Sequence, residues 1–121
     1  MSRTILVVED QEDNRRILRD LLSSAGIEMI EAVNGEEGVA LAESASPDLI
    51  LMDIQLPGFD GYEATRRIKA NPALRQIPVI AVTSYALSGD DEKARQAGCD
   101  GYVAKPYSPR ALLVKIREYL F

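Results

Sequence analysis

Four short apolar runs in this 121-residue sequence are each followed directly by polar residues that could do chemistry. The first run is followed by the carboxylates of Glu9 and Asp10, and the second by the carboxylate of Asp53. The third is followed by the hydroxyl of Thr83, and the fourth by the ammonium group of Lys105. A lone acid after a strand is often only a helix cap. Asp53 is harder to explain in that way, because charged residues are seldom placed among large apolar ones without a partner.

Taken together, these groups favour phosphoryl chemistry at a magnesium ion. Carboxylates that lie side by side repel one another, and a hard divalent cation with oxygen ligands relieves the repulsion. Mg²⁺ fits because it uses one or two carboxylates and completes its shell with water and phosphate oxygens. A free oxygen of Asp53 could then attack phosphorus and form an aspartyl phosphate. Thr83 would supply a hydrogen bond, and Lys105 a positive charge, to the transferring oxygens.

The apolar runs predict the strands that would bring these groups together. Three runs are uninterrupted and rich in β-branched residues, as in strands that are buried on both faces. A further segment carries two glutamates and is typical of an exposed edge strand. The expected strands are 5–8, 27–32, 49–52, 79–82 and 102–104, and helical patterns occupy 13–25, 35–45, 60–70, 88–98 and 109–121.

This alternation predicts an α/β fold of five βα units, with a doubly wound parallel sheet and helices on both faces. The carboxyl ends of parallel strands lie at one edge of such a sheet, where ligands bind. In the first helix, we expect Ile17 on the inward stripe with Leu18 and Leu22, and Arg15 on a solvated face. No linker or repeat interrupts the pattern, so residues 1–121 are expected to form one domain.

Composition and charge exclude several classes of protein. The 14 basic and 19 acidic residues give a net charge of −5, which argues against direct binding to nucleic acid or to an anionic membrane. No apolar run exceeds four residues, so we expect no membrane span and a cytoplasmic protein. The absence of histidine excludes Ser–His and Cys–His nucleophiles, histidine-ligated metals and a phosphohistidine in this chain. The single Cys99 cannot form an internal disulfide.

Five segments of the sequence resemble the receiver domains of two-component response regulators. They are Val7-Val8-Glu9-Asp10, Leu51-Met52-Asp53-Ile54-Gln55-Leu56-Pro57-Gly58, Asp60-Gly61, Ile80-Ala81-Val82-Thr83-Ser84 and Gly101-Tyr102-Val103-Ala104-Lys105-Pro106. The resemblance covers essentially the whole chain, and the first loop is similar to that of DivK-like single-domain regulators and hybrid-kinase receivers. It implies a flavodoxin-like (βα)5 sheet of strand order 2-1-3-4-5, an order for which a receiver is itself a standard example.

The resemblance also implies a function and a site. Asp53 would accept a phosphoryl group from the phosphohistidine of a histidine kinase or histidine phosphotransfer protein. Mg²⁺ would be held by Glu9, Asp10, Asp53 and the backbone carbonyl of Gln55. Lys105 would pair with Asp53 or its phosphate. The protein would then be a signalling switch, catalysing only its own phosphorylation and dephosphorylation.

The switch itself would involve Thr83 and Tyr102. The resemblance implies that on activation Thr83 would swing toward the phosphoryl group and Tyr102 would rotate inward behind it. This movement would change the surface of the fourth helix, fifth strand and fifth helix, where a downstream effector protein would bind. An alternative for Tyr102 is an ordinary strand aromatic that packs in the core.

Other functions on the same topology are less consistent with the residues. An aspartate-nucleophile phosphohydrolase also uses Mg²⁺, but it usually carries a second aspartate where this chain has Gln55. A flavin mononucleotide carrier would need a hydroxyl-rich phosphate loop where Glu9 and Asp10 would repel a phosphate. A receiver-like scaffold that is never phosphorylated would have no need for every catalytic position to be filled.

Overall fold

The computed structural model describes residues 3–83, 90–105 and 107–120. Ser84, the expected helix start at Ser88 and Pro106 lie outside the described residues. The strands are β1 (Arg3–Val8), β2 (Ile27–Ala32), β3 (Leu49–Asp53), β4 (Val79–Thr83) and β5 (Gly101–Ala104). The helices are α1 (Glu12–Ser24), α2 (Gly35–Ala45), α3 (Gly61–Ala70), α4 (Asp90–Ala97) and α5 (Pro109–Leu120). The expected order of elements is confirmed.

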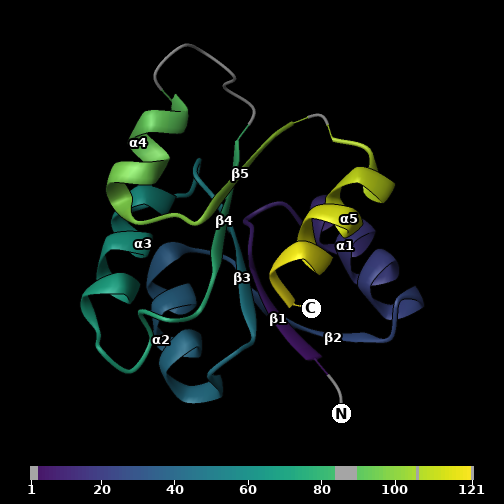
Figure 1. The fold of residues 1–121 in the computed structure, drawn as a ribbon, viewed down its shortest axis with the longest axis horizontal. Helices are drawn as coiled ribbons and strands as arrows, with labels where there is room; N and C mark the ends of the chain where they lie inside the picture. The colour runs from purple at the N-terminus through teal and green to yellow at the C-terminus, as the bar shows by residue number, and fades with distance from the viewer. Residues whose placement is uncertain (1–2, 84–89, 106, 121) are drawn as a thin grey trace.

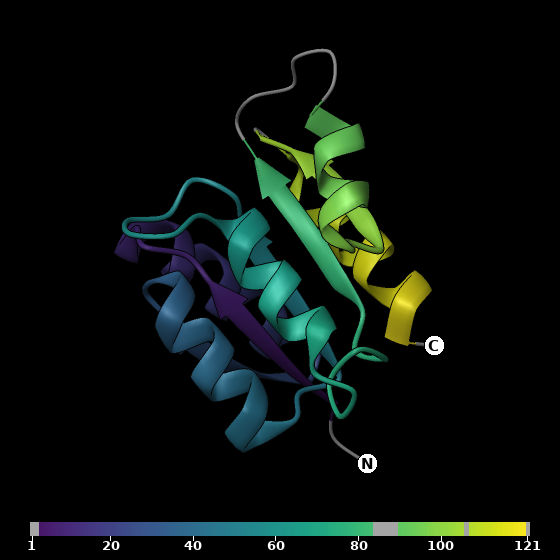
Figure 2. The same ribbon diagram turned by 90° about the vertical axis from the view of Figure 1, so that its left-hand side faces the viewer.

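The five strands form one all-parallel sheet of order β2-β1-β3-β4-β5. Helices α1 and α5 cover one face, and α2, α3 and α4 cover the other (Figure 1). Figure 2 looks onto the second face, with α3 between α2 and α4. This is the doubly wound arrangement and the strand order expected from the sequence.

Burial follows the predicted patterns strand by strand. Every residue of β3 and β4 is buried, as are the last four residues of β1, which fits central strands packed by helices on both sides. Strand β2 is an edge, with Glu28 exposed and Glu31 half-buried. The core is divided between the two faces, with Leu22 and Ile116 buried on one and Met52 on the other.

Local signals explain where several helices begin and end. The side chains of Asn34, Asp60 and Ser108 each accept a backbone N–H three residues later, at the starts of α2, α3 and α5. Gly26 follows α1 with φ of 75°, and Gly98 follows α4 with φ of 103°, a conformation that is costly for residues with a Cβ.

The inward stripe of α1 is narrower than the sequence predicted. Leu18 and Leu22 are buried, but Ile17 is 51% exposed, so the prediction for Ile17 is wrong. Ile17 and Leu18 are adjacent and therefore point about 100° apart around the helix axis. The rotation of α1 against the sheet brings Leu18 into the core and leaves Ile17 outside it.

Candidate functional site

Strand register brings the predicted acids together. Val8 of β1 pairs with Met52 of β3, so the residues that follow them, Glu9 and Asp53, lie side by side at the carboxyl edge of the sheet. Carboxylate oxygens of Glu9, Asp10 and Asp53 all lie within 4.8 Å of one another. Glu9 is 3% exposed and Asp53 is 5% exposed, whereas Asp10 is half-buried. The cluster is thus an acidic pocket with one more accessible member.

Lys105 supplies the positive charge of the site. It follows β5, whose Ala104 pairs with Thr83 of β4. Its Nζ lies 3.0 Å from Oε1 of Glu9 and 3.4 Å from Oδ2 of Asp53. Burial lowers the pKa of Lys105, but its contacts with these two carboxylates outweigh burial and raise the pKa above its ordinary value. Lys105 is therefore held as a cation between the two acids.

Glu9 is held in its ionised form by donors on several sides. The backbone N–H of Gln11 donates to Oε2 at 3.0 Å, and Nδ2 of Asn14 donates to Oε1 at 3.3 Å. Burial raises the pKa of Glu9, but the Gln11 N–H and the Lys105 ammonium more than offset this, so the pKa lies below its ordinary value.

Asp53 has the opposite balance. Burial raises its pKa from 3.8 to about 6, and the neighbouring Glu9 carboxylate adds to the rise. The N–H of Gln55, which donates to Oδ1 at 3.0 Å, and the charge of Lys105 oppose it only in part. A buried carboxylate that is costly to ionise gains more than an exposed one from a bound cation.

Thr83 and Tyr102 lie on neighbouring strands beside this cluster. Thr83 ends β4 and is 1% exposed, and Val82 before it pairs with Asp53. Tyr102 pairs with Ala81, and it is half-buried against a small cluster that includes Ile54. Because side chains alternate along a strand, Ala81 and Thr83 face the same side of the sheet as Tyr102. The structure therefore brings all the predicted site residues to one region.

Sequence reasoning missed the position of Arg15. The side chain was expected to be solvated, but it is only 12% exposed, and its Nη1 donates to the carbonyl oxygen of Glu9 at 2.9 Å. No sequence signal marks this contact, since its acceptor is a backbone atom whose position depends on how α1 packs.

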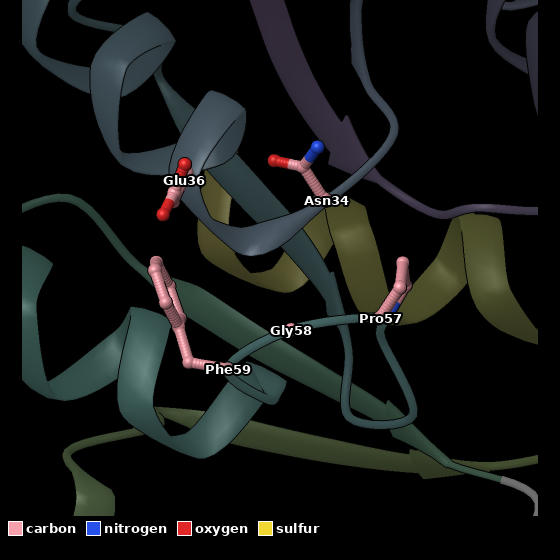
Figure 3. A pocket seen from close by; sticks show the side chains of 5 residues that line it. All are labelled: Asn34, Glu36, Pro57, Gly58 and Phe59. Atoms are coloured by element: carbon pink, nitrogen blue, oxygen red, sulfur yellow. The ribbon is translucent and has the colours of Figure 1, made fainter.

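A separate hollow lies at the same edge of the sheet, between the start of α2 and the loop that follows β3. It has a volume of about 250 Å³ and is lined by Asn34, Glu36, Pro57, Gly58 and Phe59 (Figure 3). None of the acidic cluster lines this hollow. The candidate site is therefore the acidic cluster and not this hollow.

Comparison with known proteins decides the family. Residues 5–117 match the response regulator receiver domain. The chain belongs to the receiver family of two-component response regulators. It is 47% identical over 120 residues to the polar-differentiation response regulator DivK of Brucella anthropi, covering 99% of this chain and 98% of that protein. The resemblance read from the motifs is confirmed.

Solved structures agree with this assignment. A putative response regulator from Chloroflexus aurantiacus matches this receiver with a TM-score of 0.94 at 29% identity, covering 99% of this chain and 98% of that one. The receiver domain of the sensor histidine kinase PA1611 from Pseudomonas aeruginosa matches with a TM-score of 0.92 at 38% identity and the same coverage. That structure has a magnesium ion coordinated in its active-site cleft.

The acidic cluster of this receiver fits the same kind of ion. Its donors are carboxylate oxygens, which Mg²⁺ prefers, and the half-buried Asp10 leaves an open side for water. The receiver is thus a phosphorylation-dependent signalling module with an acidic pocket of the kind that suits magnesium.

Among residues 3–83, 90–105 and 107–120, no helix is long and apolar enough to cross a membrane.

Proposed function

We propose that this receiver accepts a phosphoryl group on Asp53 from the phosphohistidine of a histidine kinase or histidine phosphotransfer protein. The observation that supports this most strongly is the contact of Asp53 with both an acidic cluster and Lys105. These 121 residues contain no histidine, so the phosphohistidine must lie outside them. As an Asp53 oxygen bonds to phosphorus, the phosphorus–nitrogen bond of the donor breaks and its imidazole leaves.

In this proposal Mg²⁺ is held by Glu9, Asp10, Asp53 and the backbone carbonyl of Gln55. The bound ion would neutralise charge on the acids and on the phosphoryl oxygens. Gln55 already fixes Asp53 through its N–H at 3.0 Å from Oδ1. That hydrogen bond orients the carboxylate through Oδ1. The other oxygen, Oδ2, lies 3.4 Å from Nζ of Lys105 and would be free to attack the incoming phosphoryl group.

Lys105 and Thr83 would act on the phosphoryl oxygens. Lys105 approaches within 3.4 Å of Asp53, so its ammonium can follow the negative charge as it moves from the carboxylate to the phosphoryl group. Thr83 ends the strand next to Asp53, where its hydroxyl can donate to a phosphoryl oxygen. Movement of Thr83 would open space that Tyr102 fills from the same face of the sheet.

The effector would bind at the surface formed by α4, β5 and α5. All four residues of β5 are half-buried, unlike the fully buried strands β3 and β4. A half-buried edge strand can shift at lower cost than a central one, because fewer core contacts are lost. This supports β5 as the element that carries the change from Thr83 to the outside.

The experiment is phosphorylation by a small acyl phosphate or phosphoramidate with Mg²⁺, followed by intact-mass analysis. We expect one added phosphoryl group on the wild type and none on Asp53→Asn. Asp60→Asn is the matched control, because asparagine can replace aspartate as the N-cap of α3 and the adduct should remain. An unmodified wild type, or an adduct on Asp53→Asn, would overturn the proposal.

A further inference from the structure

Arg15 is a mostly buried cation with three partners on three different segments. Its Nη1 donates to the carbonyl oxygen of Glu9 at 2.9 Å, and its Nε donates to Oε1 of Glu31 at 3.1 Å. Its Nη2 pairs with Glu12 in the first turn of α1. Only 12% of the side chain is exposed, so these contacts lie largely out of water. A guanidinium has several donors in a fixed plane, which allows one side chain to hold this set.

Two of these contacts tie Glu9 to the end of the edge strand β2. The backbone N–H of Glu9 donates to the carbonyl oxygen of Ala32 at 3.0 Å. Arg15 joins the carbonyl oxygen of Glu9 to the carboxylate of Glu31, the residue before Ala32 in β2. Glu31 is itself fixed by Arg19, at 2.6 and 2.9 Å. Both sides of the Glu9 backbone are therefore anchored to consecutive residues of one strand.

The position of Glu9 matters because its carboxylate belongs to the acidic cluster. Its oxygens lie within 4.8 Å of oxygens of Asp10 and Asp53. Mg²⁺ demands short, nearly octahedral bonds, so a small shift of one ligand reduces affinity. Removing a partner that orients a metal ligand typically lowers metal affinity by roughly 10- to 100-fold.

We propose that Arg15, held by Glu31, is a positioning residue that fixes the Glu9 backbone for Mg²⁺ binding. This inference rests on the proposed function, because it needs the acidic cluster to bind the ion. Arg15 touches neither the ion nor the phosphoryl group in this scheme. It acts through the Glu9 carbonyl.

The neighbouring Arg16 provides a matched control on the same helix. Its side chain is 59% exposed and pairs with Asp13, which is also exposed. Replacing either arginine by methionine removes one positive charge from the same helix while keeping a long side chain. Simple electrostatics predicts that both variants bind Mg²⁺ slightly more tightly, because a repulsive charge is lost. The positioning role predicts the opposite for Arg15 alone.

The test is titration of isotope-labelled protein with Mg²⁺, followed by backbone amide shifts of the residues around Asp53. We expect Arg15→Met to weaken binding about tenfold, the lower end of what removing a partner of a metal ligand costs. Arg16→Met should bind as tightly as the wild type or slightly more tightly. Glu31→Gln keeps an acceptor for Arg15 but removes its charge, so it should weaken binding less than Arg15→Met.

The double variant Arg15→Met/Glu31→Gln tests the connection between the two residues. If they act together, its affinity should equal that of Arg15→Met, since the two losses are then not additive. Unchanged or tighter binding by a folded Arg15→Met would overturn the positioning role, and additive losses would overturn the route through Glu31. A wild type whose cluster shows no Mg²⁺-dependent shifts would refute the proposed function as well, which separates the two failures.

Discussion

Replacing Asp53 by asparagine should make the metal-free protein more stable near neutral pH. Asp53 is 5% exposed, and burial raises its pKa from 3.8 to about 6. At about 1.4 kcal/mol per pKa unit, ionising this buried group costs ~3 kcal/mol of folding free energy. Asparagine has nearly the same shape and no charge. The cost already includes the opposing attraction of Lys105, so we expect Asp53→Asn to raise the free energy of unfolding by about 3 kcal/mol.

The gain should depend on pH in a defined direction. Because the pKa of Asp53 is higher in the folded state than in the unfolded chain, the folded protein holds its proton more tightly. The stabilising effect of that proton is complete below the ordinary value of 3.8 and is lost as pH rises through about 6. The advantage of Asp53→Asn should therefore be small near pH 4, grow up to about pH 6, and stay constant above it.

Urea unfolding followed by circular dichroism, with a metal chelator present, measures this difference. Asp20→Asn is the control, because it makes the same change of charge at an exposed position of α1. Adding Mg²⁺ should stabilise the wild type more than Asp53→Asn and so reduce the advantage of the variant, since only the wild type offers the Asp53 carboxylate as a ligand. A variant no more stable than the wild type near pH 7, or a difference independent of pH, would refute the reasoning.

Two other predictions concern the ion and the backbone behind it. Since the raised pKa of Asp53 lets protons compete with Mg²⁺, affinity measured by amide shifts should fall about tenfold between about pH 7 and pH 5; constant affinity over that range would contradict it. Gly61→Ala should lower the free energy of unfolding in urea by about 2 kcal/mol or more, because its Cβ would lie 2.2 Å from the carbonyl oxygen of Asp53. Gly58→Ala is the comparison, because its Cβ would meet no atom within 4 Å and the variant adds only the strain of a φ of 78°. An equal loss of unfolding free energy in Gly58→Ala would show that the clash with Asp53 is not the cause.

The sequence predicted the topology well because its signals are local. Uninterrupted apolar runs mark β3 and β4, and both are buried along their whole length. The carboxyl ends of parallel strands meet at one edge in any such fold, so Asp53 and Lys105 could be placed together without knowing a single distance.

Predictions about individual side chains depended on contacts that no local pattern contains. Ile17 and Leu18 have similar hydrophobicity and adjacent positions, yet only Leu18 is buried. The choice between them is made by the rotation of α1 against the sheet and α5. A helical period alone defines a stripe but not its exact edge.

What the sequence determined by itself is the fold class, the residue types at the carboxyl edge and the chemistry they favour. The tertiary structure decided how those residues are held. It gave Asp53 a raised pKa through burial beside Glu9, and it turned Arg15 from an expected surface charge into a mostly buried link between Glu9 and Glu31. Both results have one physical cause: desolvation and hydrogen bonding depend on atoms that are distant along the chain and adjacent only after folding.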